Sequence, residues 1–521
     1  MCFQTQWFFC PFWSLITACL VSLVEILKHQ EWNPPLSWIS TMSVLLYRSS
    51  SADDSDTTVI HSPSLSEIEL EAGSKQLDAS FERKTMRRVD WRLLPILGAL
   101  YALSLIDRTN VGVAGLTSMS ADLGLDVGTR YSIVSCIYFV PYILLELPSN
   151  MFLRAVGARN LLTGTVLAWG AVQLAMGFVP TWGYLVLCRT LLGVFEAGFF
   201  PALVFIVTTW YKRPEVQKKL AALYMTSILA GGFSAILAYA LNLLDGKGGL
   251  SGWSWIFIIE GAATMIFGIA SWIFIPDFPD KNTFLTAEQT ALVLRRIEED
   301  RGDALPDSMR GKVLLHLSDW KVWIFALMYL CVTVPAYAIG FFVTSILSGM
   351  GWNLEMSLLL TAPPYAFAAV SVVSFAWLSD RYHMRALFIA IQTVMTIIGL
   401  TLTAYAGPPG WRYTGIFLAN AGCSASIPGI LAYSSNNIIS HSKRAVTTAI
   451  TVSFGGIGGI IATTIYRQQD IPRYIPGLLT TISLQVLLLI LLGIMTAHFW
   501  YENKKVKSKG DGQAGEFLYM L

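Results

Sequence analysis

The chain has 521 residues, of which 54% are hydrophobic and 13% are charged, and its mean hydropathy is +0.55. Soluble globular proteins carry about 25% charged residues, so this composition excludes an ordinary water-soluble protein and places most apolar side chains against lipid. The formal net charge of +2 excludes the broad basic surface that nucleic-acid binding requires.

The amino-terminal part, residues 1–82, precedes the first predicted bundle. Residues 7–27 form an apolar run, and residues 49–81 are acidic and rich in serine, which is typical of a disordered cytoplasmic tail. A thirteenth span at the apolar run is topologically possible, whereas a cleaved signal peptide is disfavoured because no basic residue precedes the run. Our hypothesis is that residues 1–41 are a gene-model extension and that translation starts at Met42.

From residue 83 onward, apolar runs long enough to cross a bilayer recur between short polar loops. Backbone groups in lipid must bond internally, so these runs are helices. The expected spans lie near 93–115, 130–150, 160–179, 184–210, 220–243 and 254–275, then near 323–347, 356–378, 386–406, 413–434, 445–466 and 476–500. The predicted fold class is all-α: a polytopic membrane protein with twelve transmembrane helices in two six-helix bundles, at 83–275 and 323–500.

A polar loop at 276–322 separates the predicted bundles, and a tail at 501–521 follows them. The loop contains LTAEQTALVLRRIEEDRG, the pattern of an amphipathic helix at the membrane surface. Lysine and arginine are concentrated in the loops on the side of residues 82–92 and are sparse in the opposite loops. The positive-inside rule therefore predicts that both termini are cytoplasmic. We expect a multi-pass protein of the plasma membrane that acts as a monomer.

Charged and amide side chains interrupt the predicted spans: Asp107, Arg108 and Asn110 in the first, Glu146 in the second, and Arg189 and Glu196 in the fourth. An ionised side chain at the centre of a membrane helix costs at least about 2.5 kcal/mol, so such groups normally face a partner or a water-filled cavity. Arg189, Gly193, Glu196 and Phe200 share one helical face, which we expect to line an internal aqueous cavity.

Two interpretations of these charges compete. In the structural one, Asp107 neutralises Arg108 or Arg189, and the pair fixes the register of the helices. In the functional one, the arginines attract an anion, because guanidinium binds carboxylate well. Asp107, Glu146 and Glu196 are then the candidates for carrying a proton.

The sequence offers little support for an enzymatic activity. The seven cysteines have no spacing typical of zinc, a redox pair or a disulfide framework. The histidines are isolated, and no nucleophile motif is present. We therefore predict a protein that is not an enzyme and holds no metal or cofactor.

Six strings in the same order resemble the fungal anion:cation symporters of the allantoate and nicotinate permease type, within the major facilitator superfamily. They are DRTNVGVA at 107–114, YFVPYILLELPSN at 138–150, GVFEAGFFPALVFIVTTWYKRPEVQKK at 193–219, FIPDFPDKNTFLTAEQ at 274–289, YSSNNIISHSKRAVTTAI at 433–450 and YRQQDIPRYIPGL at 466–478. The resemblance covers about residues 84–500 and indicates the family more strongly than the substrate.

Two further motifs carry the general superfamily resemblance. RTLLG at 189–193 is similar to the fourth-span motif of proton-coupled members, and AWLSDRYHMR at 376–385 to the cytoplasmic loop motif between spans 8 and 9, with His383 in place of a glycine. The second similarity implies that Asp380, Arg381 and Arg385 are gate residues. In the first half, Arg154 stands where the corresponding acid is expected.

The resemblance implies a secondary transporter that imports a small organic anion together with protons by alternating access. The residues expected to contact the anion are Arg108, Asn110, Arg189, Tyr142 and Asn436. Packing is an alternative role for Tyr142, and a helix-to-helix amide bond is one for Asn436. A facilitated uniporter and a transporter-like nutrient receptor are the alternative functions.

Overall fold

The computed structural model describes residues 65–276, 278–301, 312–438, 441–508 and 519–520. The hypothesis about residues 1–41 and a start at Met42 lies outside the described residues. The chain divides into two units, residues 1–75 and 76–521. The described part of the first unit is helical, and the candidate membrane spans all lie in the second.

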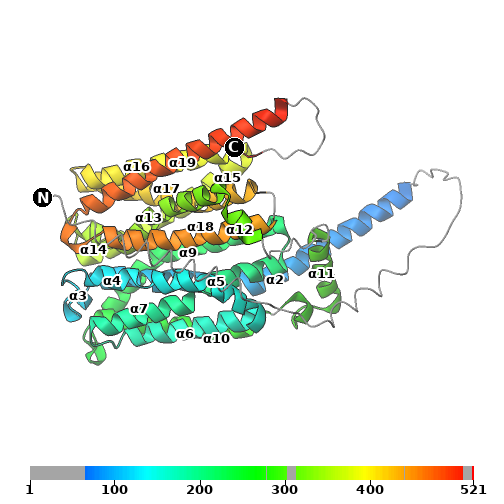
Figure 1. Ribbon diagram of the computed structural model, residues 1–521. Coiled ribbons are helices and arrows are strands. Elements are labelled where there is room, and N and C mark those ends of the chain that lie inside the picture. The colour runs from blue at the N-terminus through cyan, green and yellow to red at the C-terminus, as the bar shows by residue number, and fades with distance from the viewer. Residues whose placement is uncertain (1–64, 277, 302–311, 439–440, 509–518, 521) are drawn as a thin grey trace. The chain divides into compact units, whose positions relative to one another are not determined.

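The helices of the first half of the chain follow one another through short connections (Figure 1). They are α2 (Leu65–Ala114), α3 (Met119–Asp122), α4 (Arg130–Cys136), α5 (Phe139–Val156), α6 (Ala158–Met176), α7 (Trp182–Glu196), α8 (Phe199–Trp210), α9 (Arg213–Asn242) and α10 (Gly252–Phe274). Short 3-10 turns at Lys247–Gly249 and Pro279–Lys281 flank α10.

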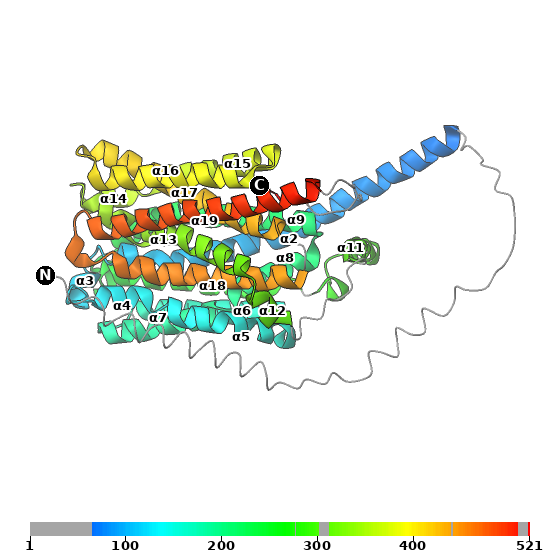
Figure 2. The ribbon, with the colours of Figure 1, turned by 45° about the horizontal axis from the view of Figure 1, so that its top comes forward.

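The amphipathic helix predicted in the central loop is α11 (Ala287–Arg301), and α12 (Lys312–Leu317) follows it. The second half then consists of α13 (Trp320–Ser348), α14 (Leu354–Leu359), α15 (Ala362–Tyr382), α16 (Arg385–Tyr405), α17 (Pro409–Asn436), α18 (His441–Ile465) and α19 (Ile475–Ser508), with a 3-10 turn at Gln468–Asp470. Figure 2 shows these long helices side by side.

The described residues are helical without strands, as the sequence predicts, and ten of their helical segments are long and apolar enough to cross a membrane. The two further expected spans correspond to α4 with α5 and to α6. Helical hydrogen bonding is interrupted between α4 and α5, and α6 begins with the polar pair Arg159 and Asn160. The all-helical membrane fold is therefore confirmed, while the count of twelve spans is not fully confirmed.

Prolines explain where three of the expected spans are divided. Pro141, Pro201 and Pro363 lie within the first turn of α5, α8 and α15. Because proline has no N–H, the carbonyl four residues before it loses its helical partner. The interruption falls there in each case, between α4 and α5, between α7 and α8, and between α14 and α15. The chain does not turn away, since Ile137, Ala197 and Leu360 keep helical dihedral angles.

Pro335 and Pro428 lie inside continuous helices, and in both cases a side chain of another helix binds the carbonyl that the proline leaves unpaired. Pro335 in α13 leaves the Cys331 carbonyl without its helical N–H partner. That carbonyl accepts a hydrogen bond from Gln485 Nε2 of α19 at 2.5 Å instead. Pro428 in α17 likewise leaves the Ser424 carbonyl without its helical partner. That carbonyl accepts a hydrogen bond from the Tyr224 hydroxyl of α9 at 3.3 Å. The second bond joins the two halves of the chain.

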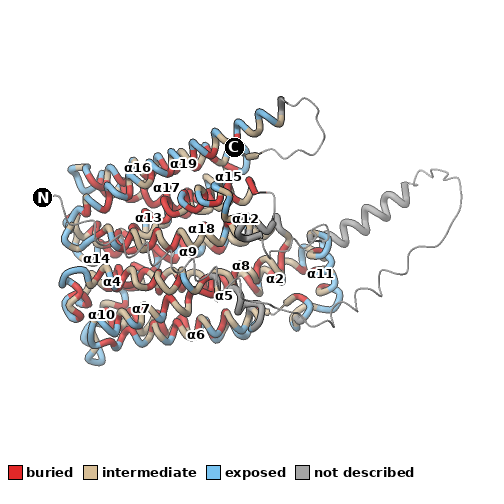
Figure 3. Tube along the Cα trace, in the orientation of Figure 1, coloured by how far each residue is buried: buried red, intermediate tan, exposed pale blue. Residues whose placement is uncertain are grey.

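Each half packs mainly within itself. In the first half, α6 lies between α7 and α10, and in the second half α13 packs against α17, α18 and α19, while α16 packs against α17. The halves meet where α9 contacts α15 and where α4 and α5 contact α18. Figure 3 shows exposed residues recurring along the outward sides of these helices. Many of them are large and apolar, such as Ile266, Val370 and Ile490, as expected for lipid-facing positions.

One ion pair fixes the start of α13. Asp319 is the N-cap residue of α13 and accepts a hydrogen bond from the Lys321 backbone N–H at 2.9 Å. It also forms an ion pair with Lys443 at the beginning of α18. Burial acts to raise the pKa of Asp319, but the hydrogen bonds from Lys443 and Lys321 outweigh burial and hold this pKa below its ordinary value. The ionised form of Asp319 therefore stabilises the fold.

We predict that Asp319→Ala lowers the melting temperature of the purified protein, since losing an N-cap costs about 0.5–2 kcal/mol. Asp319→Asn keeps an oxygen for the cap and should lose less. The contribution of the charge is complete at neutral pH and disappears as the pH falls through the lowered pKa of Asp319. Thermal unfolding in detergent across a pH series measures this, and equal melting temperatures for wild type and Asp319→Ala at neutral pH would contradict it.

Candidate functional site

The polar residues of α2 point to two sides of the helix. Asp107 and Asn110 are three residues apart and share a face, whereas Arg108 lies about a third of a turn away from Asp107. Asp107 and Asn110 contact α6 and α10. Arg108 contacts α7 and α13. One short stretch of sequence therefore supplies two separate groups of buried polar side chains.

The Arg108 guanidinium lies where the two halves of the chain meet. Its Nη2 donates to Glu196 Oε1 of α7 at 2.5 Å, and its Nη1 donates to the Tyr337 hydroxyl of α13 at 3.1 Å. The guanidinium also lies over the rings of Tyr138 and Tyr142, 5.1 Å from each centroid. The Arg108 side chain is 12% exposed and that of Glu196 is fully buried. The result is a single ion pair enclosed by three tyrosines.

Glu196 has unused hydrogen-bonding capacity. Its Oε1 accepts a second bond from the Ser104 hydroxyl of α2, also at 2.5 Å. Its Oε2 is buried and has no hydrogen-bond partner among the described residues. An ionised carboxylate can accept bonds at both of its oxygens. Glu196 uses only Oε1, and Oε2 remains available.

Arg189 has a different role from Arg108. It is fully buried on α7, and its Nη1 and Nη2 donate to the backbone carbonyls of Asp107 and Arg108 at 3.2 and 2.8 Å. Its guanidinium lies 5.6 Å from the centroid of the Tyr138 ring. Arg189 thus attaches α7 to the backbone of α2 at the level of the ion pair between Arg108 and Glu196.

The Asp107 carboxylate binds neither arginine. Its Oδ2 accepts hydrogen bonds from Trp169 Nε1 of α6 at 3.1 Å and from the Thr264 hydroxyl of α10 at 2.8 Å. The structural interpretation, in which Asp107 neutralises Arg108 or Arg189, is therefore wrong: Glu196 pairs with Arg108, and Arg189 binds backbone carbonyls.

Asn110 contacts an acid that the sequence analysis did not single out. Its Nδ2 donates at 3.0 Å to Oε2 of Glu260, which lies on α10 and is 2% exposed. The signal was present in the sequence, because Glu260 is an acidic residue inside the expected span 254–275, as unusual there as Glu196 is in its own. The structure brings Asn110 to this acid rather than to Arg108.

The remaining candidates lie at other places. Glu146 of α5 accepts a hydrogen bond from the Ser453 hydroxyl of α18 at 3.4 Å, which joins the two halves. Asn436, at the end of α17, donates to the Met520 sulfur of the carboxyl-terminal tail at 3.4 Å. Only Tyr142 joins Arg108, stacked on Tyr138 with ring centroids 5.6 Å apart.

Two of the three expected gate residues, Asp380 and Arg385, form an ion pair at the connection between α15 and α16. Asp380 Oδ1 accepts from Arg385 Nη2 at 2.7 Å, and the Arg381 guanidinium lies over the Trp377 ring, 5.5 Å from its centroid. His383, at the position of the motif glycine, has a φ of 56°. That left-handed conformation explains why glycine suits this position.

The expectation that this face of α7 lines an aqueous cavity is wrong at Gly193. A Cβ built there would lie 2.2 Å from the Tyr138 carbonyl oxygen and 2.9 Å from Pro141 Cγ. Gly193 therefore lies at a tight crossing between α7 and the start of α5, without room for water. This crossing carries Tyr138 to its position beside both Arg108 and Arg189.

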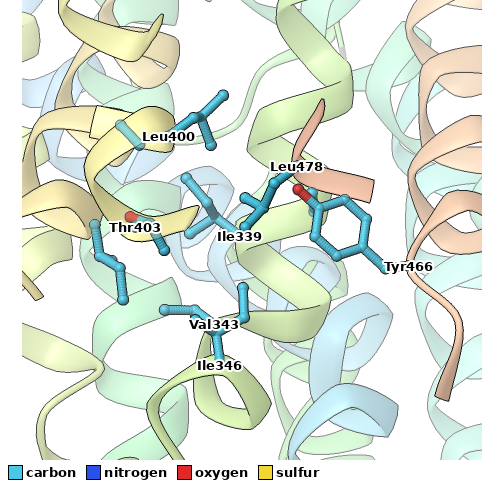
Figure 4. Close-up of a pocket in the computed structure, with 10 residues that line it drawn as sticks. Ile339, Val343, Ile346, Leu400, Thr403, Tyr466 and Leu478 are labelled. Carbon is cyan, nitrogen blue, oxygen red and sulfur yellow. The ribbon is translucent and has the colours of Figure 1, made fainter. Parts of the chain in front are cut away.

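A cavity of about 20 Å³ lies elsewhere, inside the second half (Figure 4). Apolar side chains of α13, α16 and α17 line most of it, including Ile339, Leu400 and Ile416. It has room for about one water molecule and is too small and too apolar for an organic anion. No group of three or more His, Cys, Asp or Glu side chains within the described ranges is placed to hold a metal.

Comparison with known proteins agrees with this architecture. The family model described as Major Facilitator Superfamily matches residues 97–463. The chain belongs to this superfamily. Arg108, which is 12% exposed, the buried Arg189 and three buried acids on α2, α7 and α10 are therefore the polar centre of a major facilitator protein.

Several relatives are named as transporters. The chain is 30% identical to the MFS transporter prlL of Fungal sp. (strain NRRL 50135), over 87% of this chain and 94% of that protein. It is 31% identical to the uncharacterized transporter C11D3.18C of Schizosaccharomyces pombe, over 84% of this chain and 87% of that protein. This superfamily member is accordingly a multi-pass membrane transporter.

A solved structure supports the fold. The crystal structure of a bacterial homolog to the human lysosomal transporter Spinster, in an inward-facing and occupied conformation, superposes with a TM-score of 0.60 and 16% identity. The match covers 78% of this chain and 96% of that one. At this identity the likeness concerns the fold alone.

We predict that Gly193→Ala destabilises the transporter, because the new methyl group would meet backbone and proline atoms that cannot rotate away. Overpacking of this kind typically costs about 1–3 kcal/mol. Gly164→Ala on α6 is the matched control, since nothing lies within 4 Å of a Cβ there. Fluorescence-detected melting of both variants measures the difference, and a Gly193→Ala protein as stable as Gly164→Ala would contradict the tight crossing.

Proposed function

We propose that this superfamily member is a proton-coupled importer of small organic anions, of the fungal anion:cation symporter type, and that it works by alternating access. The observation that carries the proposal is the ion pair between Arg108 and Glu196, which is buried between the two halves and has one carboxylate oxygen without a partner. Arg108 has one ionic partner, the Glu196 carboxylate, and a carboxylate of the substrate can take the place of that partner.

Arg108 is the proposed anion-binding residue. Its guanidinium offers a planar pair of N–H donors that matches a carboxylate, and tyrosine faces at 5.1 Å favour a planar organic group beside it. Tyr142 then stacks on the substrate, and the Tyr337 hydroxyl follows the movement of α13. Arg189 contributes positive charge while it holds the backbone of α2.

Glu196 is the proposed carrier of the coupling proton. An external proton that binds the free Oε2 neutralises the acid, weakens its hold on Arg108 and leaves the guanidinium available to the anion. Release of the proton to the cytoplasm restores the ion pair and expels the anion from Arg108. Proton binding and anion binding therefore favour one another, which is the requirement for symport.

Alternating access needs contacts between the halves that can open. The bond from Arg108 to Tyr337 is one, and those from Ser453 to Glu146 and from Tyr224 to the Ser424 carbonyl are others. All three are single hydrogen bonds; one between neutral groups contributes about 0.5–1.5 kcal/mol, and one to a charged group about 1.5–3 kcal/mol. Rocking of one half against the other can exchange them at modest cost.

The uptake test uses yeast that lacks its own organic-anion permeases and expresses this transporter. Labelled nicotinate, pantothenate, allantoate and a dicarboxylate are offered at a series of external pH values, with and without a protonophore. We predict that at least one anion accumulates, that its uptake rises as the external pH falls, and that the protonophore abolishes accumulation. Uptake indifferent to pH and protonophore would identify a facilitated uniporter instead, and signalling without uptake of any anion would identify a nutrient receptor.

Variants at the ion pair test the roles of its two members. Arg108→Ala should reduce uptake by about tenfold to a hundredfold, because a hydrogen bond to a charged group contributes roughly 1.5–3 kcal/mol. Glu196→Gln, which resembles the neutral acid, should retain exchange of labelled for unlabelled anion but lose dependence on the proton gradient. Arg130→Ala is the control, since Arg130 binds the Gly124 carbonyl at the loop before α4. All variants are compared at equal surface expression, and normal uptake by Arg108→Ala would refute the anion site.

A further inference from the structure

A second polar group occupies the seam between α2 and α10, on the side of α2 that faces away from Arg108. Asp107 and Asn110 are one turn apart on α2, and Glu260 and Thr264 are one turn apart on α10. Thr264 donates to Asp107 Oδ2 at 2.8 Å, and Asn110 donates to Glu260 Oε2 at 3.0 Å. These two hydrogen bonds place Asp107 and Glu260 along the contact between α2 and α10.

Three oxygens in this seam lack partners. Asp107 Oδ1, Asn110 Oδ1 and Glu260 Oε1 are buried without a hydrogen bond among the described residues, and none of the three residues is more than 3% exposed. An unsatisfied buried polar atom destabilises the fold, and it does so more strongly when it is charged. The three atoms without a partner are all oxygens, so a proton bound to one of the carboxylates would let that oxygen donate to another.

No cation in the described ranges compensates the two acids. The charged groups that face this part of α2 from α7 are Arg189 and Glu196, and they bind backbone carbonyls and Arg108 respectively. From α6, the side chain that contacts Asp107 is the uncharged indole of Trp169. Residues 220–242 of α9, which packs against α10, include no charged residue.

We infer that this seam is a second proton site, in which Glu260 carries the proton and Asn110 is its positioning residue. A proton on Glu260 Oε1 turns that atom into a donor, and Asn110 Oδ1 is the matching acceptor. The acid and the amide then form a cyclic pair, since the Asn110 amide already donates to the other Glu260 oxygen. One proton thus satisfies two of the three unpaired atoms. Neither Glu260 nor its pairing with Asn110 takes part in the ion pair at Arg108.

The inference rests on the proposed function, because the proton matters for transport only if transport is proton-coupled. Binding from outside adds one proton to the Glu260 carboxylate, and release inside returns that carboxylate to its charged form. A monoanion that enters with this proton and with the one on Glu196 brings a net charge of +1. Its uptake therefore responds to an inside-negative membrane potential, whereas uptake with one proton is electroneutral.

Glu260→Gln is the test, because a glutamine can form the same cyclic pair with Asn110 and resembles the protonated acid. The purified protein is reconstituted into vesicles, and labelled nicotinate is the first probe, replaced by another monoanion if the uptake screen favours one. We expect Glu260→Gln to exchange labelled for unlabelled probe as the wild type does, and to lose the increase in accumulation that an inside-negative potential produces. Glu355→Gln, on the exposed start of α14, is the control and should behave as wild type.

A second measurement does not depend on transport. Infrared difference spectra of the vesicles between alkaline and acidic buffer record the carboxyl groups that take up a proton, and Glu260→Gln should lose one such band that wild type and Glu355→Gln retain. A wild type that ignores both proton gradient and potential would refute the proposed function, while the band at Glu260 would still support the proton site. If Glu260→Gln keeps its response to potential or keeps every band, the second proton site is wrong.

Discussion

The burial of charge in a helix surrounded by lipid is the constraint on which this structure depends. An ionised group there needs a partner or water, and α2 presents polar side chains to two different places. Arg108 turns toward Glu196 and Tyr337, while Asp107 and Asn110 turn toward α10. Adjacent residues of a helix differ by about 100° in direction, so neighbours in sequence serve different sites. The separation of the proposed anion site from the proposed second proton site follows from that geometry.

The sequence predicted much of the fold because its signals are local. Apolar length marks the spans, and a proline within the first turn after each interruption accounts for the divided segments at Pro141, Pro201 and Pro363. Charged residues inside spans identified Arg108, Asp107 and Glu196 as unusual without any partner being known. The same rule applied to Glu260 would have found this further buried acid.

The partners of these residues could not be predicted, because they depend on how distant segments pack. One of the two interpretations paired Asp107 with an arginine, whereas Asp107 binds Trp169 and Thr264, more than sixty residues away in sequence. Gly193 was expected beside water and instead permits a contact with the Tyr138 carbonyl. Asn436 meets Met520 of the tail. Helical periodicity determines which residues share a face, whereas the neighbour that covers that face is a tertiary property.

The two buried arginines show how the same residue type can take a fixed and an exchangeable role. Arg189 binds carbonyls of α2 that belong to the backbone, so it cannot release them without moving the helix, and its loss should affect folding as well as transport. Arg108 binds side chains, and each of these can rotate or gain a proton. A substrate carboxylate competes with a side-chain partner more easily than with a backbone contact. Arg108 is therefore the stronger candidate for the anion, and Arg189 is the residue that keeps Arg108 in position.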